Sequence, residues 1–125
     1  MIKETKPKHI VIIDDETEIL SALERYLSRN NYKVSIFSNP ITAFDSLPKD
    51  TNLILLDIMM PQMSGLDLLP KLLEKNPKSK VLMMTAYSTL DKVLNAHKHG
   101  ATDYIMKPFP SLDILGSKIK ALLEK

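Results

Sequence analysis

The segment LILLDIMMPQMSG, residues 53–65, is the part of the sequence that decides the fold. Its first four residues form an apolar run between polar residues, which is typical of a central strand buried on both faces. Asp57 follows this run directly, and ligands of open parallel α/β sheets bind at the carboxyl ends of the strands. Asp57 is therefore a candidate functional residue, although an aspartate here can equally do no more than end a strand. Pro61 and Ser64-Gly65 indicate a loop that leads into a helix.

Strands and helices alternate along the rest of the chain. Apolar runs predict further strands over residues 10–13, 34–37, 81–84 and 102–106. Apolar residues at helical spacing, with turn signals at the ends, predict helices over residues 19–30, 40–47, 66–74, 88–99 and 112–122. Five strand–helix pairs predict the fold class, a doubly wound five-stranded parallel α/β sheet flanked by five helices with right-handed crossovers.

Two residues disturb the predicted helices. Pro70 lies inside the helical pattern of residues 66–74, where a proline costs about 3 kcal/mol, so we expect a kink or a late start there. Gly116 lies inside the last helix and costs about 1 kcal/mol relative to alanine. The middle of that helix should therefore be comparatively weak.

Size and composition fit one folded domain over residues 1–125. Hydrophobic residues make up 44% and charged residues 26% of the chain, which are ordinary values for a globular protein. The net charge is only +2 and the lysines are scattered, so we expect no direct binding of nucleic acid by this segment. The chain has no cysteine and no apolar run long enough for a signal sequence or a membrane span. We therefore expect a cytoplasmic location and no membrane contact.

Candidate site residues follow four of the five predicted strands. Asp14 and Asp15 follow the first strand, Asp57 the third, Thr85 the fourth and Lys107 the fifth. Because the carboxyl ends of parallel strands meet at one edge of the sheet, these residues can face one crevice. Three carboxylates this close repel one another, and a divalent cation with oxygen ligands, above all Mg²⁺, relieves that repulsion. The hydroxyl and the ammonium opposite them suit a phosphoryl group.

Taken together, these residues resemble the receiver domains of two-component response regulators, the CheY-like superfamily. The resemblance extends over essentially the whole chain and rests on four stretches, which are Asp14-Asp15, LLDIMMP at 55–61 with Ser64-Gly65, Thr85-Ala86, and KPF at 107–109. It implies a strand order of 2-1-3-4-5. It also implies a phosphorylation-dependent signalling switch, not an enzyme acting on a separate substrate.

The resemblance assigns the acidic residues to phosphoryl transfer. It implies that Asp57 accepts a phosphoryl group from a phosphohistidine of a sensor histidine kinase or phosphotransfer protein. Mg²⁺ would be bound by the carboxylates of Asp15 and Asp57 and by the backbone carbonyl of Met59. Asp14 would act mainly through a bound water.

Residues on the last two strands receive the switch roles. The resemblance implies that Thr85 and Lys107 hold the phosphoryl oxygens, that the Lys107–Pro108 peptide bond is cis, and that Tyr104 is the switch aromatic. Thr85 would move toward the phosphoryl group and Tyr104 would enter the space it leaves. The face formed by the fourth helix, fifth strand and fifth helix would then change its preference for a downstream output domain or effector.

Met59 and Tyr87 lie two residues beyond Asp57 and Thr85, at positions that flank the phosphoryl group in such domains. Both are bulky and largely apolar. We therefore expect them to hinder attack by water and to give a comparatively long-lived phosphoryl state.

Three other classes of protein remain as alternatives. A flavodoxin-like nucleotide binder needs a Gly-, Ser- or Thr-rich phosphate loop after the first strand, where this chain is acidic. An aspartyl-phosphate hydrolase usually has a second aspartate two residues after the first, where this chain has Met59. A purely structural interaction domain would not bind Mg²⁺.

The three histidines, His9, His97 and His99, are predicted to have no functional role. His97 and His99 do not share a helix face, which argues against a pair of metal ligands.

Overall fold

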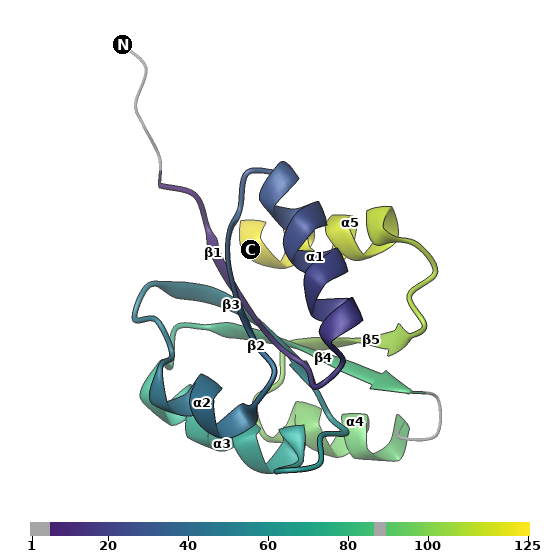
Figure 1. Cartoon of the computed structure of the whole chain (residues 1–125). Helices are drawn as coiled ribbons and strands as arrows, with labels where there is room; N and C mark the ends of the chain where they lie inside the picture. The colour runs from purple at the N-terminus through teal and green to yellow at the C-terminus, as the bar shows by residue number, and fades with distance from the viewer. Residues whose placement is uncertain (1–5, 87–89) are drawn as a thin grey trace.

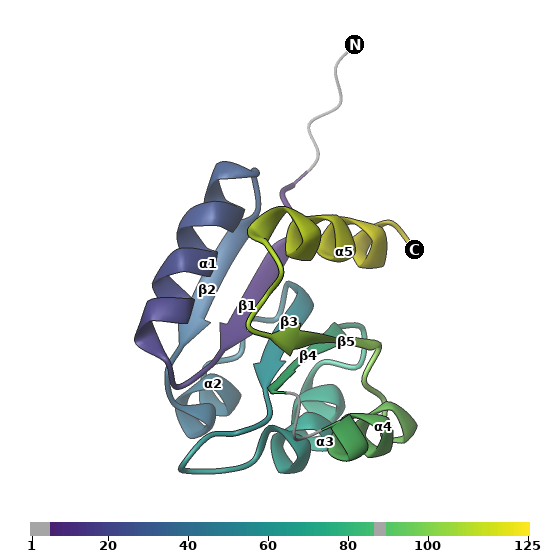
Figure 2. The same ribbon diagram turned by 90° about the vertical axis from the view of Figure 1, so that its right-hand side faces the viewer.

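The computed structural model describes residues 6–86 and 90–125 and contains one sheet of five parallel strands. The strands lie in the order β2-β1-β3-β4-β5, which confirms the predicted fold class and strand order (Figures 1 and 2). Their bounds differ from the predicted ranges by one or two residues. They are β1 (His9–Ile13), β2 (Lys33–Phe37), β3 (Thr51–Asp57), β4 (Lys80–Ala86) and β5 (Asp103–Lys107).

Helices cover both faces of the sheet (Figure 1). One face carries α1 (Thr17–Arg29) and α5 (Leu112–Glu124), and the other carries α2 (Pro40–Asp45), α3 (Gly65–Lys75) and α4 (Leu90–Lys98). Side chains alternate between the two faces along a strand. In β3, Leu53 and Leu55 belong to the core under α1 and α5, while Ile54 and Leu56 belong to the core under α2, α3 and α4. The uninterrupted apolar run of β3 follows from this double burial.

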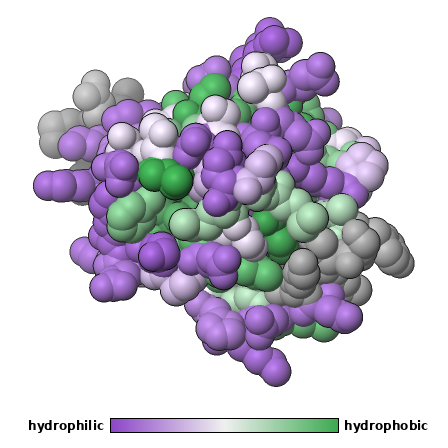
Figure 3. Space-filling view, turned by 60° about the horizontal axis from the view of Figure 1, so that its bottom comes forward, coloured by the Kyte–Doolittle hydropathy of each residue, from purple (hydrophilic) through white to green (hydrophobic). Residues whose placement is uncertain are grey.

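The outer surface is mixed in character. On the face at the bottom of Figure 1, hydrophilic residues surround smaller groups of hydrophobic ones (Figure 3). Among the described residues, no helix is both long enough and apolar enough to cross a membrane.

Side-chain caps explain where most helices begin. Asn39, Ser64 and Ser111 each accept a hydrogen bond from a backbone N–H in the first turn of α2, α3 and α5. Such caps satisfy N–H groups that have no partner within the helix. Glu16 occupies the same position before α1 but makes no side-chain cap bond. The start of α1 therefore differs from those of α2, α3 and α5.

Helix α3 does not start late. It begins at Gly65 and continues through Pro70 to Lys75. The buried side chains of this helix, Leu68, Leu69 and Leu72, hold it against the sheet on both sides of the proline. Helix stability in proteins comes mainly from such packing of an apolar face, which here outweighs the hydrogen bond that Pro70 cannot donate.

Two glycines have clear structural roles in the helices, one at the end of α4 and one at the contact between α5 and α1. Gly100 follows α4 with φ of 110°, the left-handed conformation expected of a residue that stops a helix. Gly116 lies in α5 under Tyr26 of α1, and a Cβ atom there would lie 2.6 Å from the Tyr26 hydroxyl oxygen. That hydroxyl donates a hydrogen bond to Asp113 Oδ1 at 3.0 Å. Gly116 therefore allows α1 and α5 to pack closely.

Candidate functional site

The register of the sheet brings the predicted site residues to one edge. Ile13 of β1 pairs with Leu56 of β3, so the next residues, Asp14 and Asp57, lie at the same level. On the other side, Asp57 pairs with Met84 of β4, the residue before Thr85. Carboxylate oxygens of Asp14, Asp15 and Asp57 all lie within 4.8 Å of one another. The strand-end pattern in the sequence therefore corresponds to a real cluster.

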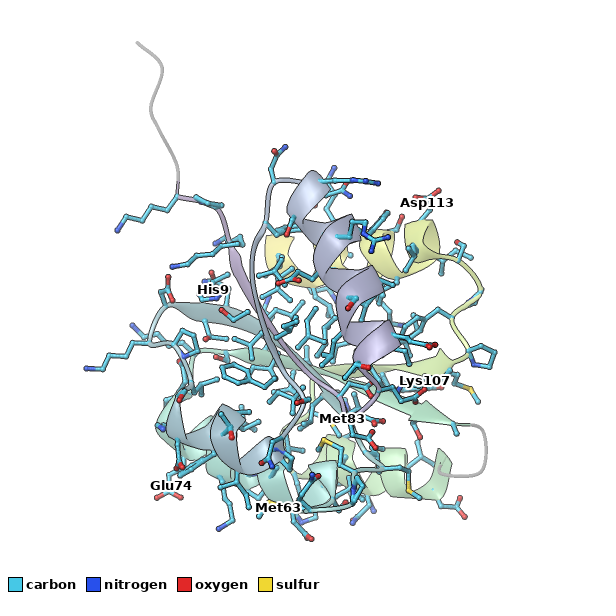
Figure 4. The ribbon with its side chains drawn as sticks, viewed as in Figure 1. His9, Met63, Glu74, Met83, Lys107 and Asp113 are labelled. Atoms are coloured by element: carbon cyan, nitrogen blue, oxygen red, sulfur yellow. The ribbon has the colours of Figure 1, made fainter. Side chains whose placement is uncertain are left out.

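Lys107 lies at the end of β5 (Figure 4), and its ammonium group contacts two of these three carboxylates. Its Nζ lies 2.5 Å from Asp14 Oδ2 and 3.4 Å from both Asp57 Oδ1 and Glu16 Oε1. The second carboxylate oxygen of Asp14 accepts the backbone N–H of Glu16 at 2.9 Å. One ammonium group therefore faces four carboxylates, counting Asp15, and negative charge is in excess.

Burial and crowding of charge perturb the acid–base behaviour of this cluster. Asp57 is 4% exposed, and its burial, followed by the charge of Asp14, raises its pKa to about 7 despite the opposing effect of Lys107. Burial alone lowers the pKa of Lys107, but its hydrogen bond to Asp14 and the nearby carboxylates bring that pKa above its ordinary value. Lys107 is therefore cationic at neutral pH. Its single positive charge does not fully compensate the carboxylates around it, so ionisation of Asp57 is disfavoured.

The backbone around Asp57 is held tightly by its neighbours. The N–H of Ile58 donates to the Met84 carbonyl at 3.2 Å, and the N–H of Gly65 donates to the Ile58 carbonyl at 2.9 Å. A Cβ atom on Gly65 would lie 2.1 Å from the Asp57 carbonyl oxygen. Only glycine fits there, which gives a physical reason for the Ser64-Gly65 pair seen in the sequence.

Thr85 and Tyr104 lie on neighbouring strands beside this cluster. Thr85 is buried, and its hydroxyl donates to the carbonyl of the next residue, Ala86, at 3.0 Å. Tyr104 is half-buried on β5 and packs against the core under α2, α3 and α4. It also lines a cavity of about 200 Å³ that it shares with Leu94 and His97 of α4. The structure therefore places Thr85 next to the cluster and Tyr104 on the side of β5 that faces α4.

Three further expectations concern residues around the cluster. Met59 lies two residues after Asp57 and is 58% exposed, so its side chain is largely in solvent. The Lys107–Pro108 peptide bond is cis, as expected. Tyr87, the other residue expected to hinder water, lies outside the described residues.

Two side chains for which the sequence predicted no role, Glu16 and His9, make ion-pair or hydrogen-bond contacts in the structure. Glu16 contacts Lys107, a contact for which its place directly after Asp14-Asp15 was the only signal. His9 was expected to be incidental, but it is 2% exposed and its ring bonds to Asp50 and Ser35, each at 2.7 Å. The position of His9 at the start of a buried apolar run was the available signal for its burial.

Known proteins share both the sequence pattern and the fold. The family model of the response regulator receiver domain matches residues 10–119. The DNA-binding transcriptional regulator NtrC of Rhizobium meliloti is 35% identical over 116 residues, covering 92% of this chain and 24% of that protein. The transcriptional regulatory protein CpxR of Escherichia coli is 36% identical over 117 residues, covering 93% of this chain and 49% of that protein. The chain thus spans about a quarter to a half of the length of these relatives.

Solved structures agree with this assignment. A CheY-like response regulator receiver domain protein from Methanospirillum hungatei superimposes with a TM-score of 0.83 at 35% identity, with 94% of each chain covered. A two-component response regulator from Clostridium difficile gives a TM-score of 0.87 at 27% identity, with 94% of this chain and 97% of that chain covered. The chain therefore belongs to the family of response regulator receiver domains.

Proposed function

We propose that this receiver domain is a phosphorylation switch in which Asp57 accepts a phosphoryl group from a phosphohistidine of a sensor histidine kinase or phosphotransfer protein. The observation that carries the proposal is the imbalance of charge at this edge, where a single ammonium faces four carboxylates. Negative charge gathered around buried carboxylates costs stability unless a proton, a cation or another ligand compensates it. Its presence supports a site that works with a bound metal.

The residues at this edge fit a divalent cation. Their oxygens lie close enough together to share one ion, and Mg²⁺ binds carboxylate and carbonyl oxygens. Asp15, Asp57 and the backbone carbonyl of Met59 would hold Mg²⁺ directly, and Asp14 would hold it mainly through water. When bound, Mg²⁺ supplies positive charge that offsets the charge developing on the phosphoryl oxygens.

The protein's own groups position the reaction. A carboxylate oxygen of Asp57 attacks phosphorus, the bond from phosphorus to the donor nitrogen breaks, and the donor histidine retains that electron pair. Lys107 and Thr85 would bind oxygens of the transferred group. Lys107 already lies 3.4 Å from Asp57 and is cationic, so it can follow the phosphoryl group with little movement.

Phosphorylation of Asp57 would change the conformation and partner preference of the face formed by α4, β5 and α5. The acyl phosphate carries about 1.5 to 2 negative charges, where the ionised carboxylate of Asp57 carries one, and it brings new acceptor oxygens. The Thr85 hydroxyl would exchange its bond to Ala86 for one to the phosphoryl group, and the Tyr104 ring would move toward the space vacated. The cavity bordered by Tyr104 and Leu94 supports this role because it leaves room on the α4 side. Phosphorylated Tyr104→Ala should signal poorly while still accepting phosphate, and unchanged partner affinity would count against the switch.

The phosphoryl state would be comparatively long-lived. The large, exposed Met59 side chain and Tyr87, which lie two residues after Asp57 and Thr85 in the sequence, would hinder the approach of a water in line with the phosphorus. Met59→Asn and Tyr87→Ala should both hydrolyse faster. Equal or slower hydrolysis in both would disprove this part of the proposal.

The output is proposed from the relatives. NtrC and CpxR are named as transcriptional regulators and are two to four times as long as this chain. We therefore propose that this receiver controls a transcriptional output domain or effector in the cytoplasm, without itself binding nucleic acid or membranes.

Labelling with a small phosphodonor tests the proposal. Incubation with acetyl phosphate and Mg²⁺ should add one phosphoryl group, seen by intact mass, to the wild type and not to Asp57→Ala. Equal masses for the two proteins would disprove the proposal. Sustained release of phosphate from a small ester, far beyond one turnover, would instead favour the aspartyl-phosphate hydrolase.

A further inference from the structure

Glu16 has a side chain whose direction is not explained by the helix that it precedes. It occupies the N-cap of α1, where Ser, Thr, Asp or Asn commonly accept a backbone N–H. Glu16 makes no such bond, and its carboxylate instead lies 3.4 Å from Lys107 Nζ, on a strand 91 residues further along the chain. Stabilisation of α1 therefore does not account for the position of this carboxylate.

We infer that Glu16 is a positioning residue that restrains Lys107 and slows the loading of Asp57 by small phosphodonors. The inference rests on the proposed phosphorylation of Asp57. In that step an Asp57 oxygen bonds to phosphorus, the phosphorus–oxygen bond to acetate breaks, and acetate leaves with the electron pair. Lys107 assists by turning its ammonium toward the phosphoryl oxygens, and each carboxylate that already holds this ammonium competes with them.

The three ion-pair partners of Lys107 among the described residues differ in what they can contribute. Asp14 is fully buried and Asp57 is almost so, and both belong to the cluster proposed to hold Mg²⁺. The Glu16 side chain is 61% exposed and lies outside that cluster. Removing its charge therefore alters the hold on Lys107 while leaving the three clustered aspartates in place.

Ion pairs with an exposed partner are weak, so the effect should be a few-fold change in rate. Glu16→Gln should be labelled by acetyl phosphate about threefold faster than the wild type. Glu18 provides the matched control because it is also exposed and lies in the first turn of α1. Its carboxylate makes no ion pair with Lys107 in the described structure, so Glu18→Gln should stay within about 1.5-fold of the wild type.

A second variant separates the restraint on Lys107 from helix stability. Glu16→Ser removes the contact and supplies a hydroxyl able to cap α1, so its thermal midpoint should rise while labelling also accelerates about threefold. Glu16→Gln should accelerate labelling with little change in thermal midpoint. If the rate followed stability across these variants, a merely structural role would explain it and the inference would be wrong.

The experiment measures initial rates of phosphoryl incorporation at fixed Mg²⁺ by intact mass, together with thermal midpoints. Equal rates for Glu16→Gln and Glu18→Gln would overturn the inference but leave the proposed function intact. A wild type that is not labelled at Asp57 would instead overturn the proposed function. These two failures are therefore distinguishable.

Discussion

The two ends of the sheet both bury an ionisable side chain, but they treat its charge in opposite ways. The acidic edge consists of Asp14, Asp15, Glu16, Asp57 and Lys107 at the carboxyl ends of the strands. The histidine edge consists of His9, Lys33, Ser35 and Asp50 at the other end. Figure 4 shows His9 and Lys107 at opposite ends of the sheet. The acidic edge has more negative charge than it can neutralise, whereas the histidine edge pairs every group.

The histidine edge is a closed hydrogen-bond network. His9 Nδ1 lies 2.7 Å from Asp50 Oδ1, and His9 Nε2 lies 2.7 Å from Ser35 Oγ. Lys33 Nζ lies 3.3 Å from the other oxygen of Asp50. These bonds join β1, β2 and the loop before β3. A fully paired network stabilises the fold, while the unpaired excess at the acidic edge is available to a ligand.

Gly65→Ala should have the largest effect, because it disturbs the backbone of the acidic edge without changing its charge. The added Cβ would lie 2.1 Å from the Asp57 carbonyl oxygen, so α3 must move. We expect a loss of about 3 kcal/mol in the free energy of unfolding, measured by urea denaturation. Ser64→Ala, which removes only the cap of α3, should cost about 1 kcal/mol. Similar losses for both would show that the close contact at Gly65 is unimportant.

His9→Ala breaks the histidine edge and should destabilise the protein by about 2 kcal/mol, because two hydrogen bonds and a buried ring are lost. His99→Ala is the control, since His99 is exposed and its ring bonds to the backbone carbonyl of Asn95, one turn earlier in α4, and should cost less than about 0.5 kcal/mol. The hydrogen bond from His9 is also the main cause that lowers the pKa of Asp50. That contribution to stability is present at neutral pH and is lost as the pH falls through the lowered pKa of Asp50.

Asp57→Asn should have the opposite effect on stability: in the absence of divalent cations, it should increase the free energy of unfolding. Burial and the charge of Asp14 raise the pKa of Asp57 to about 7, so the folded state favours the protonated form. The wild type therefore loses stability as the pH rises from about 4 through about 7, and the asparagine variant does not. Thermal or urea unfolding should show a gain of about 1 to 3 kcal/mol at pH 8 and a much smaller gain at pH 5. A gain independent of pH would contradict the excess of negative charge.

Gly116→Ala provides a smaller test, away from both edges. In an ordinary exposed helix this change stabilises by about 1 kcal/mol, but here the new Cβ would lie 2.6 Å from the Tyr26 hydroxyl oxygen. We expect the substitution to be neutral or to destabilise by up to about 1 kcal/mol in the wild type. In a Tyr26→Ala background it should stabilise by about 1 kcal/mol. Stabilisation in both backgrounds would show that Tyr26 does not restrict this position.

The sequence predicted the fold and the acidic residues because both follow from local pattern. The double burial of residues 53–56 requires a continuous apolar run, and the carboxyl ends of parallel strands must share an edge. Asp14, Asp57 and Lys107 could therefore be grouped before the structure was available.

Features that depend on packing between distant elements could not be predicted in this way. The network around His9 joins residues up to 41 positions apart, and no periodic pattern records which way each side chain points. The contact between Glu16 and Lys107 likewise depends on how the start of α1 faces β5. Pro70 is tolerated because of the leucines that anchor α3, and Gly116 is explained only by the Tyr26 ring above it.

The most direct test of the excess charge at the acidic edge is the thermal midpoint with Mg²⁺ and beryllofluoride, a mimic of the phosphoryl group. The account predicts that together they raise the midpoint of the wild type by several degrees, because they bind the folded state at Asp57. Asp57→Asn, already stabilised without ligand, should show almost no further rise. An equal rise in both proteins, or none in the wild type, would contradict the account.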